Sequence, residues 1–253
     1  MYANYHTHTW RCGHASGSER EFVENAIEGG LRILGFSDHT PQFFEGDYYP
    51  DREKMRPDKL EGYVDTVLDL KREYAGDIRI LLGLEVEYYP ALFEKLLDFT
   101  APYPFEFMIL GQHTVGSGGA GDQSVFRPTD SEEVLKQYVR QCTEALETGR
   151  FLYLAHPDMI NYTGPAEIYE KHIRGLCASL KRLHIPAEIN FLGLVERRHY
   201  PNPRFWKIAG EEGVDTVFGA DAHAVDRIFL PECEKRAMEM AKEYGLRLIE
   251  KAL

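Results

Sequence analysis

The amino-acid sequence predicts an α/β fold, built as a barrel of parallel strands with helices between them. Short apolar segments, many of them rich in β-branched residues, alternate with amphipathic stretches along the 253 residues. This alternation is typical of a parallel sheet, in which each helix connects one strand to the next. Seven such units, each with functional groups where its strand ends, favour a closed or nearly closed barrel over an open, doubly wound sheet.

Each of the seven expected strands leads into polar or metal-binding residues. The first three strands, over residues 2–5, 31–36 and 78–84, precede His6-Thr7-His8, Ser37-Asp38-His39 and Glu85. The last four, over residues 105–110, 151–155, 187–189 and 214–219, precede Gln112-His113, His156-Pro157-Asp158, Asn190 and Asp221-Ala222-His223. Because parallel strands of a barrel end on one side, these side chains are expected to meet there.

Capping residues, glycine and proline mark several helix boundaries. Ser18 to Glu21 fits a capping box that begins one helix, and Gly29-Gly30 is expected to end it. Pro165 and Pro203 stand near the starts of two later helices, where a missing N–H costs little. Residues 116–121 (GSGGAG) match neither a dinucleotide-binding fingerprint nor a Walker A motif, so a mobile loop at the barrel rim is expected there.

Composition and charge limit the class of protein. A chain of this length with 43% hydrophobic residues is expected to form one domain over 1–253. It has no leader-like start and no apolar run of about 18 residues, and its four cysteines are widely spaced, so a cytoplasmic protein without a disulfide framework is expected. The net charge of −12 argues against binding nucleic acid or anionic membranes through the bulk surface. No feature predicts the oligomeric state.

A set of nine candidate metal ligands is the most informative feature of the sequence. Seven of the ten histidines belong to it, and its members are His6, His8, His14, His39, Glu85, His113, His156, Asp221 and His223. His6 and His8 are two residues apart, so on a strand both side chains project to the same face. Imidazole and carboxylate ligands without thiolate suit zinc, iron(II) or manganese. Nine ligands exceed the needs of one ion, and we expect three ions.

Six motifs carry a resemblance to a known superfamily. They stand in the order His6-Thr7-His8, Asp38-His39, Gly83-Leu84-Glu85, Gln112-His113, His156-Pro157 and Asp221-Ala222-His223. With these motifs, over nearly its whole length, the chain resembles the polymerase and histidinol phosphatase (PHP) superfamily. The resemblance implies a distorted TIM-like (β/α)7 barrel with a trinuclear metal site at the carboxyl ends of its strands.

The resemblance also distributes the ligands among three divalent ions of zinc, manganese or iron. It implies that the first ion is held by His6, His8, Glu85 and Asp221. Glu85 would bridge to a second ion, which His113 and His156 also hold. The third ion would be held by His14, His39 and His223. Some relatives replace the residue at position 14, but this chain has a histidine there, so a complete third site is expected.

The stretch between His39 and Glu85 narrows the resemblance to one branch of the superfamily. Its length, its expected helix over 58–74 and the run 80–88 (ILLGLEVEY) are similar to those of histidinol-phosphate phosphatases, as are 187–190 (AEIN) and Tyr200-Pro201. The implied activity is hydrolysis of L-histidinol phosphate to L-histidinol and phosphate in histidine biosynthesis. A hydroxide that bridges two ions would attack phosphorus, so no protein nucleophile is required.

Two alternatives to this activity stay open. One is the same chemistry on another small phosphomonoester, such as a nucleotide, a sugar phosphate or phosphotyrosine. The other is a noncatalytic metal-binding module, which PHP domains can become inside larger assemblies. Such modules often lose ligands, whereas this chain has all nine.

Further residues are expected to act in catalysis or to orient the ligands. Glu85, His113 and Asp221 would act in catalysis as ligands, and Asp158 as the acid that protonates the leaving alkoxide. Asp38 and Glu87 stand beside ligands in the sequence. They are expected either to orient imidazole rings or to be ordinary surface acids.

Substrate-binding residues are expected near the barrel mouth. Arg197 and Arg198 follow the sixth strand and would bind phosphate through their guanidinium groups, unless they are solvated surface residues. Arg127 is a further candidate, and Asn190 and Tyr162 are candidates for contact with the amino alcohol. The chain departs from the superfamily pattern in one respect, because no arginine follows residues 156–158.

The remaining aromatic and histidine residues are assigned more ordinary roles. The aromatic segment 43–50 (FFEGDYYP) is expected either to cover the substrate or to pack across the barrel end. His172 and His184 are expected to be structural or solvated, and His199 to line the mouth.

Overall fold

Parallel strands in two sheets form the centre of the fold, in a computed structural model that describes residues 1–43, 49, 52–119 and 121–253. The first sheet has the order β1-β2-β3-β4, with bounds Ala3–Asn4, Ile33–Phe36, Arg79–Val86 and Phe107–Leu110. The second has the order β7-β8-β9, with bounds Ala187–Asn190, Asp215–Gly219 and Arg247–Leu248. Every pairing within these two sheets is parallel.

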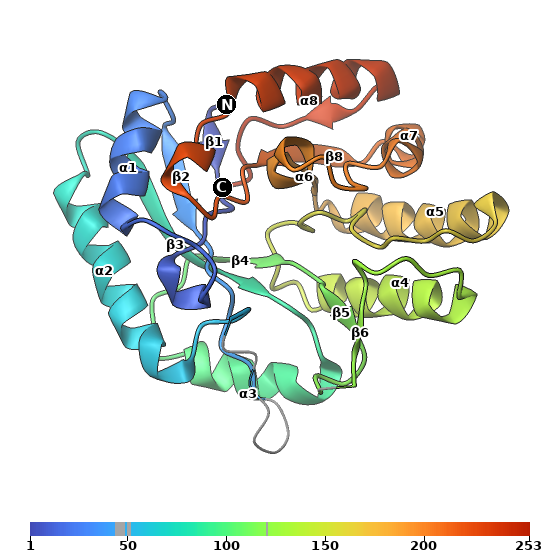
Figure 1. The fold of residues 1–253 in the computed structure, drawn as a ribbon, viewed down its shortest axis with the longest axis horizontal. Helices are drawn as coiled ribbons and strands as arrows, with labels where there is room; N and C mark the ends of the chain where they lie inside the picture. The colour runs from blue at the N-terminus through green and yellow to red at the C-terminus, as the bar shows by residue number, and fades with distance from the viewer. Residues whose placement is uncertain (44–48, 50–51, 120) are drawn as a thin grey trace.

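Isolated bridges connect the two sheets. Leu154 pairs in parallel with Leu110 of β4 on one side and with Ala187 of β7 on the other. Thr7, just after β1, pairs in the same way with Ala222, just after β8. The molecule therefore has a mixed α/β fold with a curled parallel sheet, and Figure 1 shows its helices arranged around the outside of the strands.

The fifth expected strand is shorter than the sequence predicts. Residues 151–155 form no regular strand, and only Leu154 makes bridges to both neighbours. The chain leaves the extended conformation directly afterwards, because His156 has a φ of 30°. The remaining six expected strands are confirmed, with their ends shifted by at most two residues. A hairpin of β5 (Thr114–Val115) and β6 (Gln123–Ser124) was not expected, and the glycine-rich run lies between these two strands in the sequence.

The helices lie in sequence between the strands. Their bounds are α1 Glu19–Glu28, α2 Leu60–Glu73, α3 Pro90–Thr100, α4 Glu132–Glu147, α5 Ala166–Leu183, α6 Phe191–Val195, α7 Pro203–Glu212 and α8 Pro231–Tyr244. Short 3₁₀ turns occur at η1 Trp10–Cys12, η2 Pro57–Lys59 and η3 Val225–Arg227. The capping box of Ser18 and Glu21 is confirmed, and Pro203 is the first residue of α7.

The interior of the curled sheet is filled by side chains from several strands. One buried apolar cluster consists of Ala3, Tyr5, Ile33, Leu81, Phe107, Ile109, Tyr153, Ala155 and Val217. Phe107 needs glycine opposite its ring, because a Cβ at Gly83 would lie 2.3 Å from its Cζ. A larger apolar cluster packs the helices against the outside of the strands. Apolar side chains thus pack both faces of the strands, and the polar residues lie where the strands end.

The helices and the cysteines of the described residues can be compared with what the sequence predicts about membrane spans and disulfides. Within 1–43, 49, 52–119 and 121–253, none of the helices has the length and apolar character needed to cross a bilayer. Cys12, Cys142, Cys177 and Cys233 are all buried free thiols.

Candidate metal centre

The structure brings all nine candidate ligands together at the carboxyl ends of the strands. His6 and His8 follow β1, His39 follows β2, and Glu85 lies within the end of β3. His113 follows β4, and Asp221 and His223 follow β8. The turn after η1 brings in His14, and the bridge segment at Leu154 leads into His156. Parallel strand ends meet on one side of the sheet, and this is why residues distant in sequence converge.

Glu85 lies at the centre of the site and is 2% exposed. Its Oε1 lies 3.0 Å from His156 Nε2 and 3.5 Å from the Nε2 atoms of both His6 and His113. Its Oε2 lies 2.8 Å from His39 Nδ1. Burial by itself raises the pKa of this carboxyl, but the imidazoles, first His39 and then His113 and His6, hold it well below its ordinary value. Glu85 is therefore ionised and can face more than one cation.

Asp221 forms the second carboxylate of the site. Its Oδ1 lies 3.1 Å from His8 Nε2 and 3.4 Å from both His6 Nε2 and His223 Nδ1. Burial raises its pKa, yet the neighbouring histidines, chiefly His6 and His8, keep the pKa well below the ordinary value. Asp221 and His156 both have positive φ values, 50° and 30°. Such non-glycine conformations cost about 1–3 kcal/mol each and are concentrated at functional sites.

The third part of the site is a stack of imidazoles. The ring centroids of His8 and His223 are 4.0 Å apart, and those of His14 and His223 are 4.7 Å apart. Burial and the charge of His8 lower the pKa of His223 to about 3, so its imidazole is neutral near pH 7 and can bind a metal. Cys12 is a further possible ligand that the sequence pattern did not predict, because its Sγ lies within 4.8 Å of ligand atoms of His14 and His223.

The donor atoms fit divalent metal ions. Two ligand atoms about 2.1 Å from a tetrahedral zinc lie about 3.4 Å apart, which matches the separations of His6 and His8 from Asp221. Among the described residues, buried ring nitrogens without a hydrogen-bond partner include His6 Nε2, His8 Nε2 and His223 Nε2. Buried polar atoms are normally paired, and a bound cation satisfies those aimed at the same space.

Glu188, which the sequence pattern did not predict as a site residue, contacts two of the candidate ligands, His6 and His156. It is fully buried within β7. Its Oε1 accepts from His6 Nδ1 at 2.8 Å and from Tyr153 Oη at 3.2 Å. Its Oε2 accepts from the backbone N of His156 and from Asn190 Nδ2, both at 3.1 Å. The sequence signal was a lone acid between Ala187 and Ile189 in an apolar strand.

The space around Glu188 is closed by the neighbouring strand. A Cβ at Gly219 of β8 would lie 1.7 Å from Glu188 Oε1, so this position accommodates only glycine. Asn190 Nδ2 also donates to Asp221 Oδ2 at 3.1 Å, and its Oδ1 accepts from the N of Gly193. The placement of Asn190 thus differs from the expected substrate contact, because its side chain is buried and holds Asp221.

Two further acids lie beside ligands, as the sequence suggested. Glu87 Oε1 accepts from His113 Nδ1 at 2.8 Å and also lies 3.0 Å from Lys54 Nζ. Asp38 Oδ1 lies 3.5 Å from His8 Nδ1, and its other oxygen accepts from Thr9 Oγ1. Both acids are buried, so neither is an ordinary surface acid.

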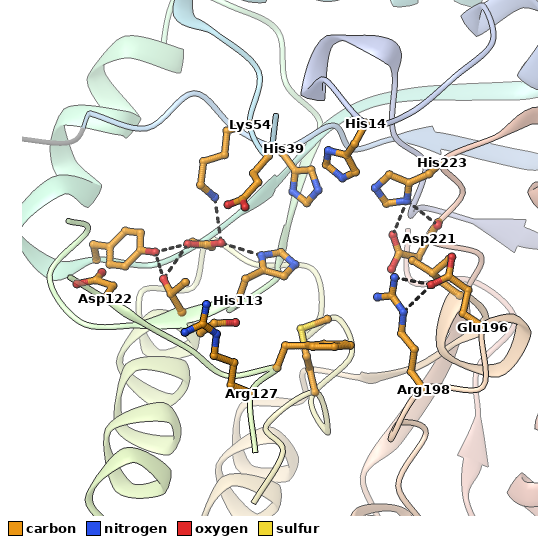
Figure 2. Close-up of a pocket in the computed structure, with 18 of the residues that line it drawn as sticks. His14, His39, Lys54, His113, Asp122, Arg127, Glu196, Arg198, Asp221 and His223 are labelled. Atoms are coloured by element: carbon orange, nitrogen blue, oxygen red, sulfur yellow. Dashed lines mark hydrogen bonds and ion pairs between the residues drawn. The ribbon is translucent and has the colours of Figure 1, made fainter. Parts of the chain in front are cut away.

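A cavity of about 520 Å³ opens beside the ligands. Figure 2 shows His14, His39, His113, Asp221 and His223 along it. Its other described lining residues include cations, acids and apolar groups, namely Lys54, Arg127, Arg198, Glu53, Glu87, Asp122, Glu196, Phe126, Met159 and Leu192. Such a wall can receive a small molecule with both anionic and cationic groups.

Of the expected phosphate-binding arginines, Arg198 and Arg127 line this cavity, whereas Arg197 is not among its described lining residues. Arg197 is exposed and has a φ of 53°, which turns the chain before Arg198. The Arg198 guanidinium donates to Glu196 Oε2 and to Tyr200 Oη, both at 2.7 Å. Its carbon Cζ lies 5.4 Å from the centre of the Phe126 ring. Arg198 is therefore held in one orientation at the mouth.

Asp158 and Tyr162 also differ in placement from the expectation. Neither is among the described residues that line the cavity. Asp158 is fully buried, and its Oδ2 accepts from Trp206 Nε1 at 2.8 Å and from the backbone N of Asn202. Tyr162 is 5% exposed and stacks on Tyr169, with the ring centroids 6.2 Å apart. Both side chains are thus directed into packing between the strands and the outer helices.

The other histidines have local partners. His172 Nε2 lies 2.9 Å from Glu132 Oε1, and His184 is the left-handed residue that ends α5. His199 Nε2 donates to the carbonyl of Met159, and its ring contacts Phe126 at the mouth. Residues 44–48 and 50 of the segment expected to cover the substrate lie outside the described residues.

Metal loading is expected to release protons near neutral pH. Burial lowers the pKa of His8, but Asp221, Asp38 and Glu85 raise it to about 9 in the metal-free protein, against an ordinary 6.5. Charged His8 therefore stabilises the metal-free fold fully below about pH 6.5, and this contribution is lost as the pH rises through about 9. Metal affinity follows the opposite trend, because only neutral imidazole binds.

Titration calorimetry tests this expectation. Zinc is added to metal-free protein at about pH 7.5 in two buffers of different ionisation enthalpy. Heats that differ between the buffers give the number of protons released. Equal heats would contradict the prediction that His8 is charged in the metal-free protein and loses its proton when zinc binds.

Comparisons with known proteins agree with this geometry. Residues 4–191 match the PHP domain family. The chain is 26% identical over 86% of its length to a protein of Deinococcus radiodurans named "Probable histidinol-phosphatase", of which the match covers 85%. It is also 26% identical, again over 86% of its length, to the histidinol-phosphatase of Bacillus subtilis, of which the match covers 92%.

A solved structure shares the fold. The crystal structure of histidinol phosphate phosphatase from Lactococcus lactis, complexed with zinc, L-histidinol and phosphate, aligns with a TM-score of 0.75 and 20% identity. The alignment covers 98% of this chain and 95% of that protein. The family match covers well over half of the chain, and the ligand motifs that define the site lie on a matching fold. The chain therefore belongs to the PHP domain family.

Proposed function

We propose that this protein is a metal-dependent phosphomonoesterase that hydrolyses L-histidinol phosphate to L-histidinol and phosphate. The observation that carries the proposal is the set of nine ligand residues gathered beside one cavity of about 520 Å³. Relatives named histidinol-phosphatase, and a Lactococcus lactis structure that holds zinc, L-histidinol and phosphate, support this substrate.

Three divalent ions of zinc, manganese or iron fit the donor set best. His6, His8 and Asp221 form one group of donors within reach of a single ion. Glu85 with His156 and His113, whose Nε2 atoms lie 3.0 Å and 3.5 Å from its Oε1, forms another. His39 and His223 form a third, beside Cys12 and His14. When bound, such ions supply an activated water near neutral pH and offset the negative charge on the phosphoryl oxygens.

The protein's own residues bind and orient the reactants. Glu188, Glu87 and Asn190 hold the ligand side chains in place, so that little reorganisation is needed when substrate arrives. Arg198 and Arg127 are the arginines placed to receive a phosphate group, since both line the cavity. For Asp158, Asn190 and Tyr162 the packing favours a supporting role over direct contact with substrate.

We also infer that the strands complete a distorted barrel of seven segments. The two bridges of Leu154 and the bridge between Thr7 and Ala222 support this arrangement, because together they link the two different sheets. A closed wall would hold the nine ligands rigidly with respect to one another, which a multinuclear site requires.

A substrate comparison tests the proposed activity. Zinc-, manganese- and iron(II)-loaded protein is assayed for phosphate release from L-histidinol phosphate, nucleoside monophosphates, sugar phosphates and phosphotyrosine. We expect kcat/KM to favour L-histidinol phosphate by about 10³-fold or more, about 4 kcal/mol of discrimination. Similar rates on every substrate would reject the assignment of substrate. Absence of hydrolysis with every metal would favour a noncatalytic metal-binding module.

A further inference from the structure

Lys54 is a buried lysine on the wall of the metal-site cavity. It is 6% exposed, and its Nζ lies 3.0 Å from Glu87 Oε1. Lysine is rarely buried unless it is paired, because removing its charge from water is costly. Glu87, also buried at 5% exposure, is its partner in the structure. The pair therefore has a fixed geometry, unlike the exposed ion pairs elsewhere on the surface.

The same oxygen of Glu87 connects this pair to the metal centre. Glu87 Oε1 accepts from His113 Nδ1 at 2.8 Å, while its Oε2 accepts from Tyr89 Oη and Thr114 Oγ1. With Nδ1 donating to Glu87, the other ring nitrogen of His113 faces Glu85, 3.5 Å from its Oε1. Figure 2 shows a dashed line from Lys54 and one from His113, and both of these contacts are made to Glu87 Oε1.

We infer that Lys54 is a positioning residue for His113 and acts through Glu87. The inference rests on the proposed role of His113 as a metal ligand. Carboxylates that orient ligating histidines typically contribute 10- to 100-fold to metal affinity, provided that the carboxylate itself is held. Lys54 supplies this restraint from the segment between β2 and α2, whereas Glu87 and His113 follow β3 and β4. Lys54 also balances one negative charge in a site with several buried acids.

Zinc retention of Lys54→Met tests the inference without any substrate. This variant keeps an unbranched chain of similar length but removes the charge. Wild-type and variant proteins are loaded with zinc and titrated with a chromogenic chelator. We expect Lys54→Met to bind one equivalent of zinc about 10- to 100-fold more weakly, as His113→Ala also should, and Lys54→Arg to recover most of the affinity.

Lys59→Met is the matched control, because Lys59 is exposed on η2 and should leave zinc affinity unchanged. Lys54→Gln serves as a second variant if Lys54→Met does not fold. Unchanged zinc affinity in Lys54→Met, with weaker inhibition by inorganic phosphate, would make Lys54 a direct anion contact and overturn the inference. A lower melting temperature with unchanged zinc affinity would also overturn it. Because zinc is measured without substrate, an error in the proposed substrate would not affect this result.

Discussion

Replacing Glu85 by alanine is expected to lower kcat/KM for phosphate release by at least about 10³-fold, about 4 kcal/mol of transition-state stabilisation. The carboxylate lies within 3.6 Å of ring nitrogens of His6, His8, His39, His113 and His156. Removing the Glu85 carboxylate takes away a negative charge that contacts five of the candidate histidine ligands. The amount of bound zinc should therefore fall together with the rate of phosphate release. Phosphate release and zinc content of the purified variant are the measurements.

An exposed acid provides the control for this substitution. Glu239 is exposed on α8, so the Glu239→Ala variant should keep both wild-type activity and wild-type zinc content. If Glu85→Ala kept full activity, the proposed site would be wrong. If the wild-type protein released no phosphate, and Glu85→Ala bound less zinc and melted at a lower temperature, the result would instead favour a metal-binding module.

Replacing Glu188 by glutamine is expected to be nearly as damaging as replacing it by alanine. All four of its partners, on His6, Tyr153, His156 and Asn190, donate hydrogen bonds to its two oxygens. A glutamine side chain would turn its own NH₂ group toward two of these donors. Each unsatisfied buried donor costs about 1–3 kcal/mol, so unfolding free energy should fall by at least about 2 kcal/mol.

The same substitution should also affect the metal site. His6 loses the acceptor that fixes its Nδ1–H, and we expect zinc affinity and kcat/KM each to fall by about 10- to 100-fold. Denaturant unfolding and chelator titration of Glu188→Gln, Glu188→Ala and the exposed control Glu239→Gln measure these quantities. Wild-type zinc affinity in Glu188→Gln would show that His6 is oriented by other contacts.

The pattern of the sequence predicted the ligand set, because such residues must stand at strand ends and therefore occur at recognisable positions. His6 and His8 illustrate this, since their spacing of two places both side chains on one face of a strand. Capping signals such as Ser18 with Glu21 act over a single helical turn, so they too could be read locally. The fifth strand was harder, because its single bridging residue, Leu154, depends on both neighbouring strands.

The supporting residues could not be read from local patterns. Glu188 and Lys54 receive their roles from partners that lie tens of residues away, and no spacing rule connects such positions. The same holds for the substrate candidates, since only tertiary packing decides that Arg198 faces the cavity while Asp158 turns toward Trp206. Loop side chains adopt directions set by whatever packs against them.

The sequence by itself thus determined the alternation of strands and helices, and it predicted nine candidate ligand residues, most of which follow strands. These properties depend on periodicity and on residue chemistry, both of which are local. Only the tertiary structure decided which carboxylate holds which imidazole, which cations line the cavity and how short the fifth strand is. Those properties depend on distances between residues far apart in the chain, which arise only when the curled sheet brings the strand ends together.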